Sequence, residues 1–258
     1  MTFNPIKLAR RIYLIKAALK AKSRNEGFVY KDRFVRSFTE NPDNPFIVSF
    51  PRTGSHWLRL LMELYFRRPS LVRAFYYPEK SDFLACHVHD HDLDVERRNV
   101  VYLYREPVAT IFSQLSYHGE NVDDVSRIVH WSDLYARHLD KWIFSETFTQ
   151  HKTVLCYDRM REDLEREFSS LCAHFSEKLD RQRLRRVART VSKGEVKNLT
   201  AHDHRVVPDR PDYDDARKTF AGKHAPLVWK TLRGRNSRLE PYLSGKADGG
   251  KANDVDDD

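Results

Sequence analysis

The sequence predicts an α/β fold of three layers, α/β/α, around a central, mainly parallel sheet. Two observations carry this prediction. Short apolar, β-branched and aromatic runs at 45–50, 83–89, 99–104 and 152–157 alternate with helical patterns, and alternation of this kind is typical of parallel sheets covered by helices on both faces. At 258 residues the chain is long enough to bury the core of one such domain. We therefore expect a ligand outside the carboxyl ends of the strands.

The helices are expected in the intervals between the strands. The pattern "LRLLMELYFRR" follows the first strand, and Pro107 suits the first turn of the helix that follows 99–104. Asp158 is expected to cap the helix after the strand at 152–157. From about 193 to 225 the helical pattern loosens. Further helices are expected over 122–146, 158–175 and 180–191.

Three regions are expected along the chain. Residues 1–40 would form a basic amphipathic helix and its lead-in, because residues 1–25 hold seven Lys or Arg and no acid. This helix could lie on an anionic membrane or dock on its own domain, and both readings stay open. Residues 41–244 would form the α/β domain. The Gly-rich, acidic stretch 245–258 is expected to be disordered.

The bulk composition bounds the class of protein. A net charge of +8 and a pI near 9.3 favour an anionic ligand or surface. No apolar run approaches the roughly 20 residues of a membrane span. Cys86, Cys156 and Cys172 show no CxxC pairing and are expected to be buried free thiols in a reducing compartment. We therefore expect a globular cytoplasmic protein, and the oligomeric state stays open.

The stretch "FPRTGSHW", residues 50–57, has the strand–loop–helix layout that holds phosphates. The Walker signature is absent, because Ser49 stands where its first glycine would be and no Lys follows Gly54. An ordinary strand–turn–helix with a chance arginine is the alternative. A loop of this kind suits a single phosphate flanked by an arginine, with an aromatic placed to stack on a base. The residues expected to bind are Arg52, Thr53, Gly54, Ser55, His56 and Trp57.

A second anion site is expected at the same edge of the sheet. Arg105 comes directly after the strand at 99–104, and Ser113 follows eight residues later, about two helical turns on. An arginine after a strand is a weak signal alone. Together with the loop at 50–57 it indicates two anionic groups on one ligand.

These two segments resemble the PAPS-dependent sulfotransferase family, where PAPS is 3′-phosphoadenosine 5′-phosphosulfate. "FPRTGSHW" is similar to the family's YPKSGTTW loop, and "VVYLYREPVATIFSQ" is similar to its strand followed by an arginine and, eight residues on, a serine. The resemblance covers about residues 44–230 and is specific in these two motifs. It implies PAPS as sulfuryl donor and places Arg105 and Ser113 at its 3′-phosphate.

The resemblance is looser downstream. "VLCYDRM" is similar to a strand ending in Tyr-Glu-Asp, which would put Tyr157 beside the adenine, and "EVKN" at 195–198 resembles a segment near the same base. "FAGKHAPLVWK" keeps only part of a C-terminal loop and would put Lys223 at the 3′-phosphate, with Arg217 as a rival.

The base that accepts the acceptor's proton is expected in "ACHVHDHD", residues 85–92. The resemblance aligns "FLACH" so that His87 is the base. Ala85 replaces the family's lysine, so Arg52 would stabilise more of the leaving group. His89 is the second candidate, because a period of two puts both imidazoles on one face of a strand. A zinc cluster of these histidines and aspartates is the alternative, although the implied reaction needs no metal.

The resemblance implies in-line transfer of a sulfuryl group to a hydroxyl of a carbohydrate, glycolipid or small metabolite, with adenosine 3′,5′-bisphosphate (PAP) as the product. The alternatives are a P-loop nucleotide or sugar kinase, or a basic module that binds membranes or nucleic acid; no recognised nucleic-acid motif is present, and no nucleic-acid partner is expected. The acceptor is expected against loops around 65–82, 117–130 and 200–225. Their aromatic residues are Tyr76, Tyr77, Tyr117, Trp131 and Tyr213.

Overall fold

The computed structural model describes residues 28–77, 82–91, 93–144 and 149–243. The expected N-terminal basic helix and the acidic tail lie outside these residues. Within them, no helix combines the length and the apolar character needed to cross a membrane. The chain divides into two compact units. The first holds the described residues within 1–44, 56–87 and 181–207, and the second holds those within 45–55, 88–180 and 208–243.

The predicted parallel sheet is confirmed. In the second unit the strands follow one another in the order β2-β6-β7 and pair in parallel, β2 with β6 from Pro45↔Asn99 to Ser49↔Leu103 and β6 with β7 from Asn99↔His151 to Tyr104↔Cys156. In the first unit β3 pairs with β5, also in parallel. Helices lie in the chain between β2 and β3 and between β6 and β7, which gives the expected α/β class. The strands are β2 (Pro45–Ser49), β3 (Ser70–Leu71), β5 (Ala85–Val88), β6 (Asn99–Tyr104) and β7 (His151–Cys156).

Burial explains why the central strands are so apolar. Residues Val100 to Tyr104 of β6 are wholly buried, and so are Phe46 and Val48 of β2. Strands that are covered on both faces have no solvent side, so their sequences read as continuous apolar runs. This is why β2 and β6 could be located from the sequence within a residue.

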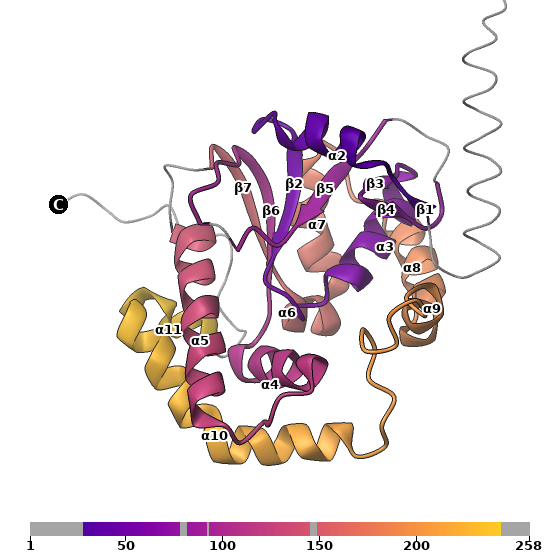
Figure 1. The fold of residues 1–258 in the computed structure, drawn as a ribbon. Helices are drawn as coiled ribbons and strands as arrows, with labels where there is room; N and C mark the ends of the chain where they lie inside the picture. Colours follow the sequence, from indigo (N-terminus) through magenta and orange to yellow (C-terminus); the bar gives the residue numbers. More distant parts are fainter. Residues whose placement is uncertain (1–27, 78–81, 92, 145–148, 244–258) are drawn as a thin grey trace, which may run out of the picture. The chain divides into compact units, whose positions relative to one another are not determined.

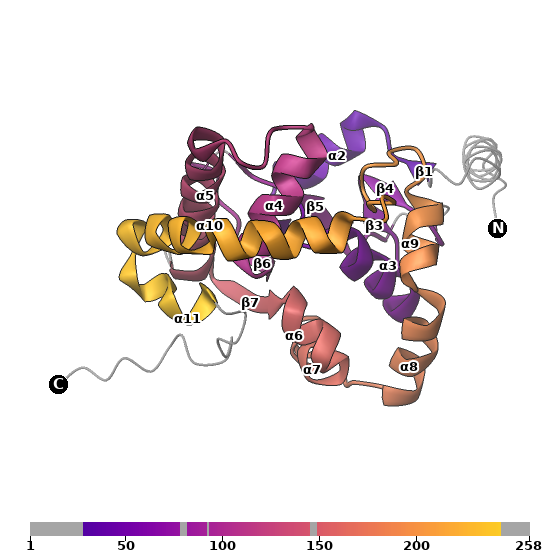
Figure 2. The same cartoon turned by 90° about the horizontal axis from the view of Figure 1, so that it is seen from below.

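Helices of the second unit flank its strands on both sides. Figure 1 shows α4 at the carboxyl end of β6 and α5 running back beside the strands, and Figure 2 shows α6 and α7 on the other side of β7. Helix α10 packs across α4 and α5. The bounds are α4 (Pro107–His118), α5 (Val125–Leu139), the π-helix η1 (Asp140–Phe144), α6 (Tyr157–Glu162), α7 (Leu164–His174), α10 (Tyr213–Arg235), the 3₁₀-helix η2 (Ser237–Leu239) and α11 (Glu240–Leu243).

Helix α4 begins where the sequence predicts. Pro107 occupies its first turn, and the Glu106 carboxylate accepts hydrogen bonds from the amides of Val108 at 2.8 Å and Ala109 at 2.7 Å. A carboxylate at this position satisfies amides that have no partner within the helix. The helix ends at Gly119, whose φ of 68° is the left-handed conformation that favours glycine. Both ends of α4 are therefore fixed by the sequence.

Three helix predictions were wrong in part. The segment 158–175 forms two helices, because Asp163 ends α6 and caps α7 through the Arg166 amide at 3.0 Å. Asp158 is not the cap, since α6 already begins at Tyr157. The expected loosening over 193–225 is replaced by two helices, α9 and α10, around an irregular stretch.

The first unit has its own core around α3 (Ser55–Phe66), whose first residue belongs to the second unit. The Glu63 carboxylate accepts hydrogen bonds from three successive amides, Phe75 at 3.0 Å, Tyr76 at 2.7 Å and Tyr77 at 2.8 Å. Tyr76 in turn donates to Glu195 at 3.2 Å. The remaining elements are β1 (Phe28–Val29) antiparallel to β4 (Arg73–Ala74), α2 (Asp32–Thr39), α8 (Arg181–Thr190) and α9 (Lys193–Leu199).

Candidate active site

The loop between β2 and α3 has an unusual backbone. Arg52 adopts a φ of 71° and Gly54 a φ of 91°. A left-handed arginine is strained by roughly 1–2 kcal/mol, and strain of this kind is commonly found at binding sites. The buried Thr53 hydroxyl donates to the carbonyl oxygen of Phe50 at 2.8 Å, which holds the turn closed. Helix α3 begins at Ser55, so the loop leads directly into amides that have no partner within that helix.

Gly54 is required by its neighbour as well as by its backbone angle. A Cβ at this position would lie 2.3 Å from Cδ2 of Tyr157. Tyr157 is the first residue of α6, directly after β7. The tyrosine ring therefore packs on the loop backbone, and no other residue type fits there without a shift of the ring.

The two motifs found in the sequence meet in space. Arg52 Nε donates a hydrogen bond of 3.1 Å to Ser113 Oγ on α4. Arg105 Nη1 donates to the carbonyl oxygen of Arg52 at 3.3 Å, and the Arg105 guanidinium lies 4.8 Å from the centre of the Tyr157 ring. These contacts form one cluster of two arginines, a serine hydroxyl and a tyrosine ring. Its members follow the carboxyl ends of β2, β6 and β7 in the sequence.

Arg105 has a buried donor that none of the described residues satisfies. Its Nε is inaccessible to solvent and has no hydrogen-bond partner among the described residues. An unsatisfied buried donor on a cation is costly, on the order of 1–3 kcal/mol or more. Such a donor is expected where a ligand completes the site. The cluster of Arg52, Arg105 and Ser113 could therefore hold an anionic group such as a phosphate.

Tyr135 on α5 holds the backbone of Arg105 from both sides. Its hydroxyl donates to the Arg105 carbonyl oxygen at 2.7 Å and accepts from the Arg105 amide at 3.1 Å. The ring lies 4.7 Å from the ring of Phe50, at the end of β2. Tyr135 thus connects the carboxyl ends of β2 and β6. Arg52 and Arg105 follow these two strand ends in the sequence.

The carboxylates of Asp158 and Glu106, near the cluster, accept hydrogen bonds from backbone amides. Asp158 Oδ2 accepts from the Glu106 amide at 2.7 Å, which links the ends of β6 and β7. Burial raises the pKa of the Glu106 carboxyl, and the amides of Ala109 and Val108 oppose that rise. Both carboxylates are bonded to backbone amides.

His89 is held at the same end of the sheet. Its Nδ1 lies 2.7 Å from the carbonyl oxygen of Ser49, the last residue of β2. A carbonyl can only accept, so Nδ1 carries the proton and, in the neutral ring, Nε2 carries the lone pair. A second histidine, His138, donates from Nε2 to the His89 carbonyl oxygen at 2.7 Å. Burial lowers the pKa of His138 to about 3, which keeps it neutral.

The other residues expected at the site are placed as follows. His87 lies half-buried on β5, which ends at Val88, so His89 lies beyond the strand. His56 and Trp57 are in the first turn of α3, and Trp57 Nε1 donates to the carbonyl oxygen of Val191 at 3.2 Å. Lys223 lies in the middle of α10, exposed, and pairs with Asp123 at 2.9 Å. The contacts described above bring together Arg52, Thr53, Gly54, Ser113, Arg105 and Tyr157.

Sequence reasoning missed Tyr135, Asp158 and His138. Tyr135 and His138 lie in the middle and last turn of α5, with no motif around them. The sequence predicts a helix cap at Asp158, not this contact. Its actual partner, the Glu106 amide, lies 52 positions away in the sequence. Contacts of this range depend on the sheet order, which no local pattern reveals.

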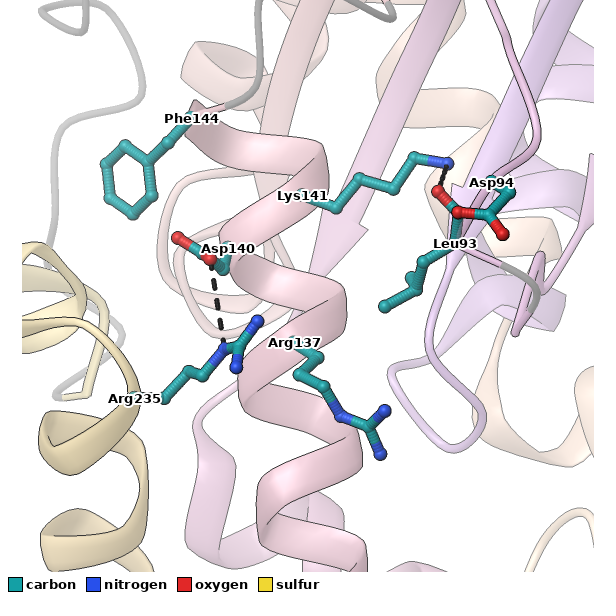
Figure 3. A pocket seen from close by; sticks show the side chains of 7 residues that line it. All are labelled: Leu93, Asp94, Arg137, Asp140, Lys141, Phe144 and Arg235. Carbon is teal, nitrogen blue, oxygen red and sulfur yellow. Dashed lines mark hydrogen bonds and ion pairs between the residues drawn. The ribbon is translucent and has the colours of Figure 1, made fainter.

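Among the described residues, no group of three or more His, Cys, Asp or Glu side chains could hold a metal ion. A hollow of about 430 Å³ lies at the end of α5 and η1 (Figure 3), lined by Leu93, Asp94, Arg137, Asp140, Lys141, Phe144 and Arg235. Its basic groups are engaged: Lys141 donates to the Leu93 carbonyl oxygen at 2.6 Å, and Arg235 approaches Asp140 at 4.0 Å.

The three cysteines are buried free thiols, as predicted.

No protein-family model matches the chain, and no curated protein matches it significantly. The chain is similar in structure to mouse sulfotransferase SULT7A1 complexed with PAP, at 14% identity over 80% of this chain and 94% of that chain, with a TM-score of 0.48. It is also similar to retinol dehydratase in complex with androsterone and inactive cofactor PAP, at 14% identity over 90% and 94%, with a TM-score of 0.48. Any functional assignment therefore depends on the site residues themselves.

Proposed function

We propose that the protein is a sulfotransferase that moves the sulfuryl group of PAPS to a hydroxyl of an acceptor. The observation that carries the proposal is the hydrogen bond of Arg52 to Ser113 beside the unsatisfied Nε of Arg105. This cluster joins the two segments whose sequences resemble the family, and it offers cationic donors for two phosphates of one nucleotide.

Each residue of the cluster has a role in this proposal. Arg105 and Ser113 bind the 3′-phosphate, which distinguishes PAPS from ATP. Arg52, with the amides of the loop into α3 and the side chains of Ser55 and His56, stabilises the 5′-phosphate as it leaves. The Thr53 hydroxyl donates to Phe50, so Thr53 contributes its amide. Trp57 and Tyr157 are proposed to contact the adenine.

The base is proposed to be a histidine at the end of β5. His89 has the hydrogen bond that a base needs, since Ser49 fixes its Nδ1 proton and directs the lone pair to Nε2. We assign the base to His89 and keep His87, which the resemblance favours, as the alternative. The histidine removes the acceptor's proton, and Arg52 stabilises the charge of the leaving group.

PAPS supplies an activated sulfuryl group whose transfer leaves PAP. The protein's own contribution is to orient the two phosphates and to accept one proton, so the proposed reaction proceeds without a metal ion. The acceptor is proposed to be a hydroxyl of a carbohydrate, a glycolipid or a small metabolite.

Calorimetric titration tests the proposal. The protein is titrated with PAP, AMP and ATP in the presence of EDTA. We expect PAP to bind tightly and AMP to bind weakly, because only PAP carries the 3′-phosphate. If PAP does not bind, or if the protein prefers ATP once Mg²⁺ replaces EDTA, the sulfotransferase proposal is wrong. A preference for ATP would favour a kinase function instead.

A further inference from the structure

A chain of aromatic side chains runs from the proposed base to the proposed cofactor site. His89 stacks on His91 with centroids 5.9 Å apart, and His91 meets the edge of Phe50 at 5.8 Å. Trp131 lies 6.5 Å from the same phenylalanine. All of these residues belong to the second unit.

The same chain continues to Arg52. His118 stacks on Trp131 at 5.4 Å with an angle of 10° between the rings, and Tyr117 lies 5.2 Å from His118. The Arg52 guanidinium lies 4.8 Å from the Tyr117 ring. We call this set the aromatic belt. Its members are His89, His91, Trp131, His118 and Tyr117, and two of them, His91 and Trp131, contact Phe50.

The belt presents imidazole rings to solvent. His91 and His118 are both exposed, whereas Phe50, which His91 contacts, is fully buried. Each exposed ring is backed by another aromatic, His91 by His89 and His118 by Trp131. Gln114, on α4, contacts His118 through Nε2 at 3.1 Å. The two exposed rings are therefore held in place and combine an aromatic face with nitrogen atoms that form hydrogen bonds.

Charges near the belt are already matched. Arg127 donates to Glu120 at 3.1 Å, and Glu120 also accepts from Trp131 Nε1 at 2.9 Å. Asp90, beside His91, pairs with Arg97 at 3.1 Å in a largely buried contact. Arg52, whose guanidinium lies over the Tyr117 ring, is the proposed ligand of the donor's 5′-phosphate. Neither of these pairs leaves an excess charge to attract an anionic or cationic acceptor.

We propose that the aromatic belt is the acceptor subsite and that it takes a neutral carbohydrate, which stacks on His91 and His118. This inference depends on the sulfotransferase function proposed above. A sugar ring combines an apolar face with hydroxyls, and exposed imidazoles match both features. A phenol favours an enclosed apolar slot, and a sulfated or carboxylated sugar needs an unpaired cation. One sugar hydroxyl then lies between the base at one end of the belt and Arg52 at the other.

The test uses ligand-observed NMR on protein saturated with PAP. Methyl β-D-glucopyranoside is the neutral probe, glucose 6-sulfate the anionic probe and 2-naphthol the phenolic probe. We expect saturation transfer to the face protons of the neutral glycoside. His91→Ala and His118→Ala should weaken its binding by about 3- to 10-fold, and His118→Phe, which keeps a ring, should weaken it less.

The matched control is His151→Ala. His151 is also exposed, but it lies at the amino end of β7, away from the strand ends that carry the site, so this substitution should leave glycoside binding unchanged. All variants are first titrated with PAP. If PAP binds but the glycoside does not, or if only 2-naphthol or the sulfated sugar binds, the acceptor inference is wrong and the sulfotransferase proposal stands. If PAP does not bind to the unchanged protein, both proposals fail.

Discussion

Arg52 and Ser113 lie 61 positions apart in the sequence and meet through a hydrogen bond of 3.1 Å from the guanidinium Nε to the hydroxyl oxygen. The bond joins the loop after β2 to the second turn of α4. It also fixes the direction of the Arg52 side chain relative to Arg105, whose Nη1 binds the Arg52 carbonyl oxygen. Preorganised cations of this kind lose less side-chain entropy when an anion binds.

Loss of the Ser113 hydroxyl should weaken PAP binding. Ser113→Ala removes the acceptor for Arg52 Nε and a proposed donor to the 3′-phosphate, and hydrogen bonds to charged groups contribute about 1.5–3 kcal/mol. We expect about 10- to 100-fold weaker binding by calorimetry. Ser116→Ala is the matched control, because the buried Ser116 hydroxyl on the same helix has no hydrogen-bond partner among the described residues. Equal effects of the two substitutions would contradict this role.

Substitution of Gly54 should destabilise the protein, whereas substitution of Gly222 should not. Gly54→Ala adds a Cβ 2.3 Å from the Tyr157 ring at a φ of 91°, which should cost about 1–3 kcal/mol in the free energy of unfolding. Gly222 lies inside α10 with nothing within 4 Å of its added Cβ, so Gly222→Ala should stabilise by up to about 1 kcal/mol. Urea unfolding measures both. A neutral Gly54→Ala would show that the loop has another conformation.

Tyr135 should act on cofactor binding without touching the cofactor. Tyr135→Phe keeps the ring against Phe50 but removes the hydroxyl that binds the Arg105 amide and carbonyl. We expect weaker PAP binding by about 3- to 30-fold, together with about 1–3 kcal/mol lower stability. Tyr242→Phe, on α11, is the control and should leave PAP binding unchanged. If Tyr135→Phe lowers only the stability, the positioning role is wrong.

Two buried histidines should make the protein less stable in mild acid. Burial lowers the pKa of His138 to about 3 and that of His174, beside His151, to about 4. In the unfolded chain both take up protons near their ordinary pKa of about 6.5, so the unfolded state binds more protons below that pH. Stability should be complete above about pH 6.5 and fall by about 1.4 kcal/mol per pH unit for each histidine below it. His174→Leu should reduce this slope between pH 6.5 and 5.5; an unchanged slope would contradict the assignment.

Measurements of kcat should distinguish the two candidate bases, His89 and His87. His89→Gln should lower kcat by about 10²- to 10⁴-fold while PAP binding is kept, because general base catalysis contributes about that factor. His87→Gln is measured beside it. A large loss for His87→Gln and a small one for His89→Gln would transfer the role to His87, as the sequence resemblance favours.

Local sequence signals located most residues of the candidate site but not the residues that position them, such as Tyr135. Arg52, Gly54, Arg105 and Ser113 could be found because each lies at a fixed distance from a strand that is buried on both faces. Tyr135 could not be found, since its partners are reached only when α5 packs back along the sheet. Helix α10 was missed because Gly222 and Pro226 interrupt its pattern. The break at Asp163 was missed because a helix interior and a helix cap both tolerate an acidic residue.

The most direct measurement of the central claim compares PAP with AMP on the unchanged protein and on Arg105→Ala. These ligands differ by the 3′-phosphate alone, so their ratio of affinities isolates its binding. We predict that PAP binds the unchanged protein at least about 100-fold more tightly than AMP, and that Arg105→Ala reduces this ratio below about 10, because a charged pair has been removed. A ratio that is the same in both proteins would show that Arg105 does not hold the 3′-phosphate and would contradict the account.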